Sequence, residues 1–166
     1  MKLENKQIKK IFIIDLSFWI LPVFTTIFVL FIDINNKFSK DIIDNIAMSN
    51  FTKILINNFL VYVAIILVGL INNKLPYILF YYNSIMYSGI ALIFMEHYGV
   101  VSCIIRTIPH GMTEILGLSI ATYIGINIKN IQIKNKKYLF FLGTILIFIS
   151  ALIESFVIFF FKWKLK

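Results

Sequence analysis

The chain has 166 residues, of which 60% are hydrophobic and 14% are charged, and its mean hydropathy is +0.88. This composition excludes an ordinary water-soluble domain and indicates a helical membrane protein, because long stretches carry no charge. The length predicts one integral membrane domain, residues 1–166, without a separate soluble domain. The net charge of +8 comes from lysines near the ends of apolar stretches. Such lysines are typical of topology signals and lipid contacts, so we expect no nucleic-acid partner.

The apolar stretches predict an all-α fold, a polytopic transmembrane helical bundle with about five spans. They cover residues 11–32, 54–71, 75–95, 109–128 and 138–161. Each is close to the roughly 20 residues that a helix needs to cross a bilayer. The first stretch is too long for the apolar region of a signal peptide and contains Asp15 and Pro22, so we expect a retained span.

Two further segments predict short amphipathic helices at the membrane surface. Residues 33–50 repeat apolar side chains at helical spacing opposite charged ones, and a solvated loop is the alternative. Residues 96–108 show a similar pattern, which fits a surface helix or a re-entrant piece. A sixth crossing through residues 100–108 is a further alternative, but that segment has only about half the length of a span. The second and third spans are joined by a tight polar turn, Asn72-Asn73-Lys74.

Five spans place the two ends of the chain on opposite sides of the membrane. With the N-terminus inside, the inner segments hold slightly more lysines and arginines than the outer ones. Lysine and arginine favour the cytoplasmic side, so we expect a cytoplasmic N-terminus.

A polar patch, Pro109-His110-Gly111-Met112-Thr113-Glu114, opens the fourth predicted span, and Glu154 lies within the fifth. Ionisable residues at membrane depth are expensive, which makes these residues candidates for a functional site. The fourth span begins and the fifth ends at the same membrane face. At ~1.5 Å per residue, Glu114 and Glu154 lie roughly 7 and 10 Å from that face. We therefore expect both carboxyl groups in one leaflet, with Asn57 and Asn58 at comparable depth and Asp15 near the opposite surface.

Helical spacing also gathers small and polar residues into one stripe on each of the last two spans. The stripes are His110, Glu114, Gly117, Ala121 and Gly125, and Gly143, Ile147, Ser150 or Ala151, and Glu154. Small residues let helices approach closely and polar residues bond across the contact, so we expect the two stripes to face each other. Four other residues are expected to complete the buried surface: Tyr62, Gly69, Tyr87 and Thr144.

The polar cluster permits three roles. Its members are His110, Gly111, Glu114, Glu154, Asn58, Asn57 and Asn83. The first role is structural, a hydrogen-bonded pin that holds the helices in register, and the asparagines suit helix–helix hydrogen bonds. The second is a pathway for protons, ions or a peptide, because a carboxyl group in apolar surroundings is often protonated and a nearby histidine can share the proton. The third is a catalytic or metal centre, because a histidine and a glutamate four residues apart can supply two ligands.

Known catalytic and cofactor motifs are missing from the sequence. It contains no H-E-x-x-H, no G-x-S-x-G, no paired serine–lysine signature and no Walker loop. The single cysteine, Cys103, excludes an intramolecular disulfide and a multi-cysteine metal site. We therefore predict no cofactor, no metal and no catalytic residue.

Several of these residues occur along the chain in an order that is typical of one protein family. They are the pair Asn57-Asn58 opening a span, Gly69 near its end, Asn83 in the next helix, the patch Pro109 to Glu114, and Ile153-Glu154 late in the last span. From about Phe51 to Val157, this pattern resembles the stage II sporulation protein M family of bacterial and archaeal membrane proteins. The P-H-G-x-x-E block with a downstream I-E is its more specific part, whereas Ser84 stands where the family often has glycine.

The resemblance implies a multi-pass protein of the bacterial cell membrane. Family members include a sporulation protein that works with a peptidoglycan-remodelling complex during engulfment. Short relatives occur beside genes for bacteriocins, circular ones especially, with roles in production, secretion or self-protection. The resemblance therefore implies a non-enzymatic membrane subunit that assembles with an export or cell-envelope complex.

Two other functions stay open. One is a transporter component that conducts protons, ions or a peptide through His110, Glu114 and Glu154. The other is an intramembrane enzyme of peptide maturation. The expected partners are membrane lipids and membrane proteins of transport or cell-wall machinery, and a homo-oligomer is also open.

Overall fold

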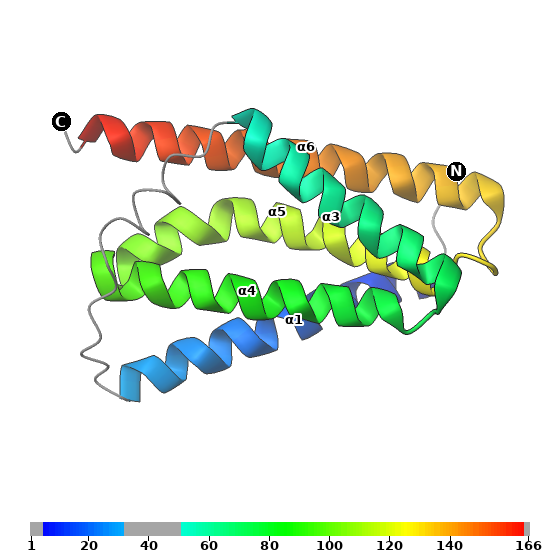
Figure 1. Ribbon diagram of the computed structural model, residues 1–166, viewed down its shortest axis with the longest axis horizontal. Coiled ribbons are helices and arrows are strands. Elements are labelled where there is room, and N and C mark those ends of the chain that lie inside the picture. Colours follow the sequence, from blue (N-terminus) through cyan, green and yellow to red (C-terminus); the bar gives the residue numbers. More distant parts are fainter. Residues whose placement is uncertain (1–4, 32–50, 165–166) are drawn as a thin grey trace.

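A bundle of five helices forms the part of the protein that the computed structural model describes, residues 5–31 and 51–164. The helices are α1 (Asn5–Phe31), α3 (Phe51–Ile71), α4 (Leu75–Tyr98), α5 (Val100–Ile126) and α6 (Ile133–Lys164). They run in alternating directions, so the start of α1 and the end of α6 lie at opposite ends of the bundle (Figure 1). The described residues contain no strand, and the predicted all-α fold is confirmed. The predicted surface helix over 33–50 lies outside them.

Three of these helices are long and apolar enough to cross a membrane: Phe51–Ile71, Leu75–Glu96 and Ile133–Phe159. They coincide with the second, third and fifth predicted spans, although α6 begins five residues before the fifth. α5 lies between them and contacts each of the other four described helices. Its residues 117–125 are all buried. Neighbouring helices therefore shelter this part of α5 from lipid, which lowers the cost of the polar side chains that it carries.

The junction between α4 and α5 overturns one prediction. Residues 96–108 do not form a separate surface helix or re-entrant piece, because α4 continues to Tyr98 and α5 begins at Val100. Gly99 makes the turn alone, with a φ of +79° that side-chain-bearing residues rarely adopt. Its N–H donates to the Met95 carbonyl at 2.9 Å, and its own carbonyl accepts from the Cys103 N–H at 3.1 Å. One helix thus ends and the next starts at a single residue, and Pro109 lies inside α5.

The turn between α3 and α4 is the tight polar turn that the sequence predicts. The Asn72 side-chain oxygen accepts from the Lys74 N–H at 2.9 Å, and the Asn72 carbonyl accepts from the Leu75 N–H at 3.2 Å. A proline follows in the first turn of α4, where its missing N–H costs nothing.

Glycines bring α5 into backbone contact with its neighbours. A Cβ at Gly69 of α3 would collide with the backbone of Gly125 in α5, and a Cβ at Gly125 would lie 2.8 Å from the Ile65 carbonyl oxygen. Gly117 of α5 faces Ile147 of α6, whose Cδ1 would lie 3.0 Å from an added Cβ. Small residues of this kind permit the close packing that holds membrane helices together.

Tyr62 and Gly143 join α3 to α6 in a similar way. The Tyr62 side chain is fully buried, and its hydroxyl donates to the Phe140 carbonyl at 2.9 Å. A Cβ at Gly143 would lie 2.5 Å from that hydroxyl, so the glycine leaves the space that the ring occupies. Tyr62 and Gly69 are buried as predicted, whereas Tyr87 and Thr144 keep partial exposure.

Substituting Gly69 by alanine tests this packing. We expect Gly69→Ala to destabilise the protein by ~2 kcal/mol, because the methyl group must displace the backbone of α5. Gly89→Ala in α4 is the matched control, because a Cβ there meets nothing within 4 Å. It should leave the melting temperature in detergent unchanged or slightly raised, since alanine favours helix. Equal melting temperatures for the two variants would contradict the close contact of α3 and α5.

Candidate functional site

The polar patch of α5 lies where this helix packs against α4 and α6. The backbone carbonyl of His110 accepts a hydrogen bond from the Ser150 hydroxyl of α6 at 3.1 Å and another from Thr113 at 2.9 Å. One to two turns further along, Gly117 contacts Ile147 of α6. Both contacts join the two stripes of small and polar residues. The prediction that these stripes face each other is confirmed.

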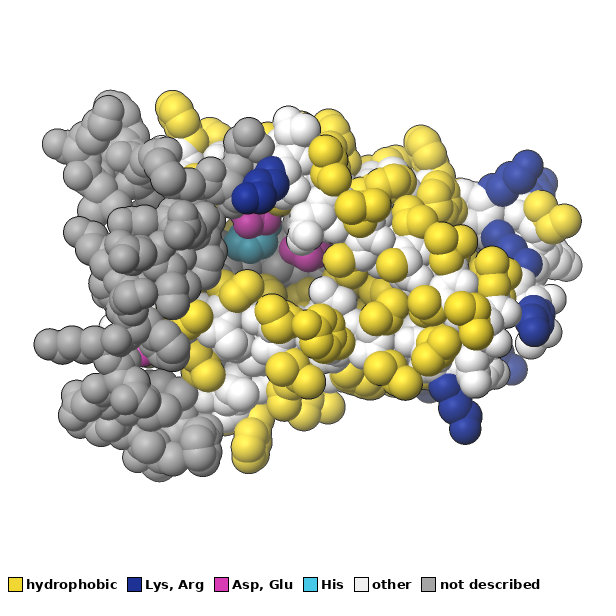
Figure 2. Space-filling view, viewed as in Figure 1, with side chains coloured by type: hydrophobic (Ala, Val, Ile, Leu, Met, Phe, Trp, Pro, Cys, Tyr) yellow, Lys and Arg dark blue, Asp and Glu magenta, His cyan; other side chains and the backbone are white. Residues whose placement is uncertain are grey.

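Glu114 and Glu154 lie near enough to each other for their charges to interact. Both side chains are only partly exposed. On this face of the molecule, Figure 2 shows histidine and acidic side chains together in a hollow, with a lysine or arginine beside them. That the two carboxyl groups share one leaflet stays a prediction.

Tyr87 of α4 lies at the same cluster, and its hydrogen-bond partner there is not predicted from the sequence. Its hydroxyl donates to the Thr107 carbonyl of α5 at 3.1 Å, and the ring lies near enough to Glu114 and Glu154 to feel their charges. A Cβ at Gly111 would lie 2.5 Å from the same hydroxyl, so only glycine leaves room for the ring there. The glycine of the P-H-G-x-x-E block therefore serves the contact between α4 and α5. A glycine within a helical pattern is the only sequence signal for such an approach.

The hydrogen bonds of the asparagines stay within their own helices. Asn57 Nδ2 donates to Asn58 Oδ1 at 3.4 Å, and Asn83 Nδ2 donates to the Leu79 carbonyl of its own helix at 2.8 Å. Neither of these two hydrogen bonds has a partner in the polar patch of α5.

The register of α3 against α6 explains the position of Asn58. Phe51 stacks edge-on against Phe148 with 5.7 Å between ring centroids, and Tyr62 reaches Phe140. Asn58 is therefore level with residues 140–148 of α6, and Glu154 lies beyond the described start of α3. The comparable depth expected for Asn57, Asn58 and the two carboxyl groups stays a prediction.

Asp15 is placed differently from the prediction. It lies in the interior of α1, where one carboxylate oxygen accepts a hydrogen bond from the Ser119 hydroxyl of α5 at 3.4 Å. Ser119 is fully buried. Asp15 is therefore a helix-contact residue between α1 and α5, a role that the sequence analysis does not predict.

The chemistry that this arrangement supports is hydrogen bonding and exchange of protons between two carboxyl groups and an imidazole. In the described part of the chain, no three histidine, cysteine, aspartate or glutamate side chains are grouped so that they could hold a metal ion.

A model of the stage II sporulation protein M family matches residues 14–157, which is most of the chain. The chain belongs to this family. The match includes every residue of the predicted polar cluster. Together with the three apolar helices, membership of the stage II sporulation protein M family identifies a membrane protein. Comparison with curated proteins and with solved structures gives no match.

The contact of Tyr87 with α5 can be tested in this family member by removing its hydroxyl. We expect Tyr87→Phe to lower the free energy of unfolding by ~1 kcal/mol, because the Thr107 carbonyl loses a donor. Tyr82→Phe is the matched control, because Tyr82 lies on the same helix with 58% of its side chain exposed. Its melting temperature in detergent should equal that of the unmodified protein. A Tyr87→Phe variant as stable as the control would show that the hydrogen bond contributes nothing.

Proposed function

We propose that this protein is a non-enzymatic, multi-pass membrane subunit that assembles with an export or cell-envelope complex. Bacteriocin production, secretion or immunity and the peptidoglycan remodelling of sporulation are the settings that family membership suggests. The observation that carries the proposal is the use of the family's polar patch in contacts between helices. Ser150 of α6 bonds to His110, and Tyr87 of α4 bonds to Thr107 beside Gly111.

These contacts fix three helices relative to one another. α4, α5 and α6 meet at the patch, and each hydrogen bond there has a backbone carbonyl of α5 as its acceptor. In an apolar surrounding, such bonds have no competition from water, so they define the helix register. A subunit whose task is to present fixed surfaces to partner proteins needs this kind of rigidity.

α1 supplies an outer surface for such partners. It packs against α4 and α5, while its opposite face carries exposed apolar residues at four-residue spacing: Phe12, Leu16, Ile20 and Phe24. In the membrane this face meets lipid or the helix of another protein. The surface supports a role as an assembly subunit within the bilayer.

Conduction of protons is the second candidate function, and the carboxyl pair favours it. Glu114 and Glu154 interact electrostatically and retain some exposure, in a protein whose neighbouring surface is apolar. Pairs of acids with a histidine at membrane depth are typical of proton relays. A conductor needs Glu114 for its ability to release a proton, whereas an assembly subunit needs only its shape and hydrogen bonds.

Substitution of Glu114 separates the two functions. For an assembly subunit, we expect Glu114→Gln to keep expression, melting temperature and partner recovery, because glutamine retains the shape and hydrogen-bonding capacity. Glu114→Leu should lower the melting temperature and reduce recovery of crosslinked membrane partners by several-fold, since it leaves polar neighbours unpaired. Glu96→Leu is the control, because Glu96 is an exposed residue of α4.

The same variants are then reconstituted in vesicles that enclose a pH-sensitive dye. An assembly subunit gives the same dye response for the unmodified protein and Glu114→Gln. A proton flux that is present in the unmodified protein and lost in the stable glutamine variant would replace the assembly proposal by the conduction proposal. If Glu114→Leu is as stable and as well assembled as Glu96→Leu, the patch has no structural role.

A further inference from the structure

Eight lysines of the described residues gather at one end of the bundle, which we call the basic end. They come from the start of α1, the turn before α4, and the residues that join α5 to α6 and open α6. Figure 2 shows lysine or arginine side chains grouped at the end of the molecule where α6 begins (Figure 1). One of these side chains is half-buried and the others are exposed. The eight lysines are Lys6, Lys9, Lys10, Lys74, Lys129, Lys134, Lys136 and Lys137.

The register of α1 against α4 places lysines of both helices at one level. The Tyr81 hydroxyl of α4 donates to Ser17 Oγ of α1 at 3.0 Å. Lys74 precedes Tyr81 by seven residues in the chain, and Lys10 precedes Ser17 by the same number. Seven residues of helix rise by roughly 10 Å. Lys10 and Lys74 therefore lie about equally far from this contact, toward the same end of the bundle.

The acidic residues of the described part of the chain lie elsewhere. Asp15 is in the interior of α1, and Glu96 is at the opposite end of α4. Glu114 and Glu154 belong to the polar cluster. The first turns of α1 and α6 contain no acidic residue either, although the helix macrodipole favours anions there and opposes lysines. The lysines of the basic end therefore do not serve the stability of these helices, and their charge is available to an external anion.

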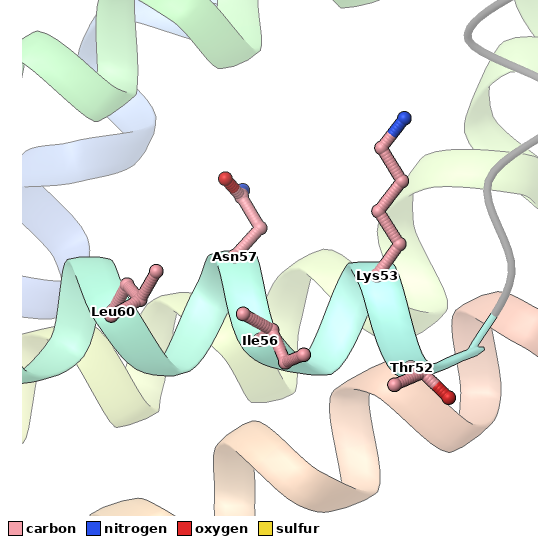
Figure 3. A pocket seen from close by; sticks show the side chains of 5 residues that line it. All are labelled: Thr52, Lys53, Ile56, Asn57 and Leu60. Atoms are coloured by element: carbon pink, nitrogen blue, oxygen red, sulfur yellow. The ribbon is translucent and has the colours of Figure 1, made fainter.

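The opposite end of the bundle presents its cation differently. A hollow along the first turns of α3 is lined by Thr52, Lys53, Ile56, Asn57 and Leu60 (Figure 3). Lys53 already has an interaction partner within the protein. The ammonium groups of the basic end form no hydrogen bond or ion pair with the residues that the structure describes. The basic end, and not the hollow, is therefore the surface that calls for an anionic partner.

Exposed apolar side chains and tyrosines lie among the lysines of the basic end. Ile8, Ile71 and Ile133 are exposed at the start of α1, the end of α3 and the start of α6. Tyr77 and Tyr138 are also exposed, and each follows a lysine within one helical turn. This mixture is typical of a membrane interface, where cations meet headgroups and apolar groups meet acyl chains. A soluble acidic protein would leave the isoleucines uncovered.

The lengths of the apolar helices place the basic end at headgroup level. The turn with Lys74 joins the candidate spans Phe51–Ile71 and Leu75–Glu96, so it lies at a membrane surface. The candidate span Ile133–Phe159 has 27 residues. That length corresponds to roughly 40 Å of helix, about 10 Å more than the hydrocarbon core of a bilayer. The first turns of α6, with their lysines, can therefore extend among the lipid headgroups.

We propose that the basic end binds anionic phospholipids of the leaflet that it faces. Their phosphates lie at lysines of neighbouring elements, and the upper parts of their acyl chains cover the exposed isoleucines. Each lysine near the surface adds to the attraction for a negative headgroup, and the described carboxylates are too far away to cancel it. Because the lysines come from several elements, more than one lipid is held at a time.

This site does not depend on the proposed assembly function. It requires only that the helices cross the bilayer, and none of its lysines belongs to the contacts of α4, α5 and α6 at the polar patch. Loss of lipid binding with intact partner assembly, or the reverse, would therefore distinguish the two proposals.

Native mass spectrometry of the full-length protein in detergent tests the basic end with two lipids. The probes are dioleoyl phosphatidylglycerol and dioleoyl phosphatidylcholine, which share acyl chains and differ in net charge. We expect phosphatidylglycerol to bind in more than one copy and more tightly than phosphatidylcholine. The combined variant Lys134→Gln, Lys136→Gln and Lys137→Gln should weaken phosphatidylglycerol binding about fivefold or more, since one lysine near an anionic surface already has a fivefold effect.

The matched control replaces the same three lysines by arginine, which keeps their charge. It should bind phosphatidylglycerol as the unmodified protein does, and all three proteins should share one melting temperature in lipid-free detergent. An equal loss of binding in the arginine and glutamine variants, or full binding by the glutamine variant, would overturn the proposal.

Two further measurements need only the unmodified protein, so they decide even where a variant does not fold. Equal binding of the two lipids would show that the basic end does not select anionic lipid, and the proposal would fail. Poly-L-glutamate at the same concentration of charge should not displace phosphatidylglycerol, because it cannot cover the isoleucines. Full displacement would replace the lipid by an acidic protein as the partner of this surface.

Discussion

The close approach of α5 to its neighbours is the constraint on which the rest of the structure depends. Without a hydrophobic driving force between helices in lipid, association relies on packing and on hydrogen bonds. Gly69 and Gly125 let α3 touch α5, and Gly117 admits Ile147 of α6. Because these contacts involve backbone and fixed side chains, they fix the axial position of each neighbouring helix relative to α5. Polar groups on different helices are then placed opposite defined hydrogen-bond partners.

The same enclosure makes the polar content of α5 tolerable. Ser119 and Thr122 are fully buried and donate to carbonyls one turn earlier in their own helix, at 2.8 Å each. Hydroxyls that bond within the helix cost little inside a bundle, whereas the two glutamates require neighbours on other helices. The P-H-G-x-x-E block, residues 109–114, lies where α4 and α6 both pack against α5.

The sequence predicts the elements of this structure better than their relative heights. The turn at Asn72 and the facing stripes follow from spacing and turn chemistry, and they agree with the structure. The turn at Gly99 is not predicted, because the apolar pattern continues without a break across a junction of one residue. The hydrogen bond of Tyr87 is not predicted, because the sequence of an apolar span does not show which carbonyl a tyrosine hydroxyl will contact.

Depth along the membrane normal is the other quantity that spacing cannot supply. Counting from span ends assumes that all helices start flush, and α6, with 32 residues, is half as long again as α3, with 21. Contacts such as Phe51 with Phe148 fix the offset, and these depend on side-chain shapes that the hydropathy pattern does not contain.

The junction at Gly99 has a mechanical consequence. A one-residue connection has no slack, and the bond from Tyr87 to Thr107 ties the same two helices a few turns away. Because the Gly99 junction and the Tyr87–Thr107 hydrogen bond join α4 and α5 at two different levels, the two helices form a stiff hairpin that moves as one unit. If a partner displaces the end of the hairpin at Gly99, α5 therefore moves along its whole length. The glycine contacts of α5 pass this displacement to α3 and α6.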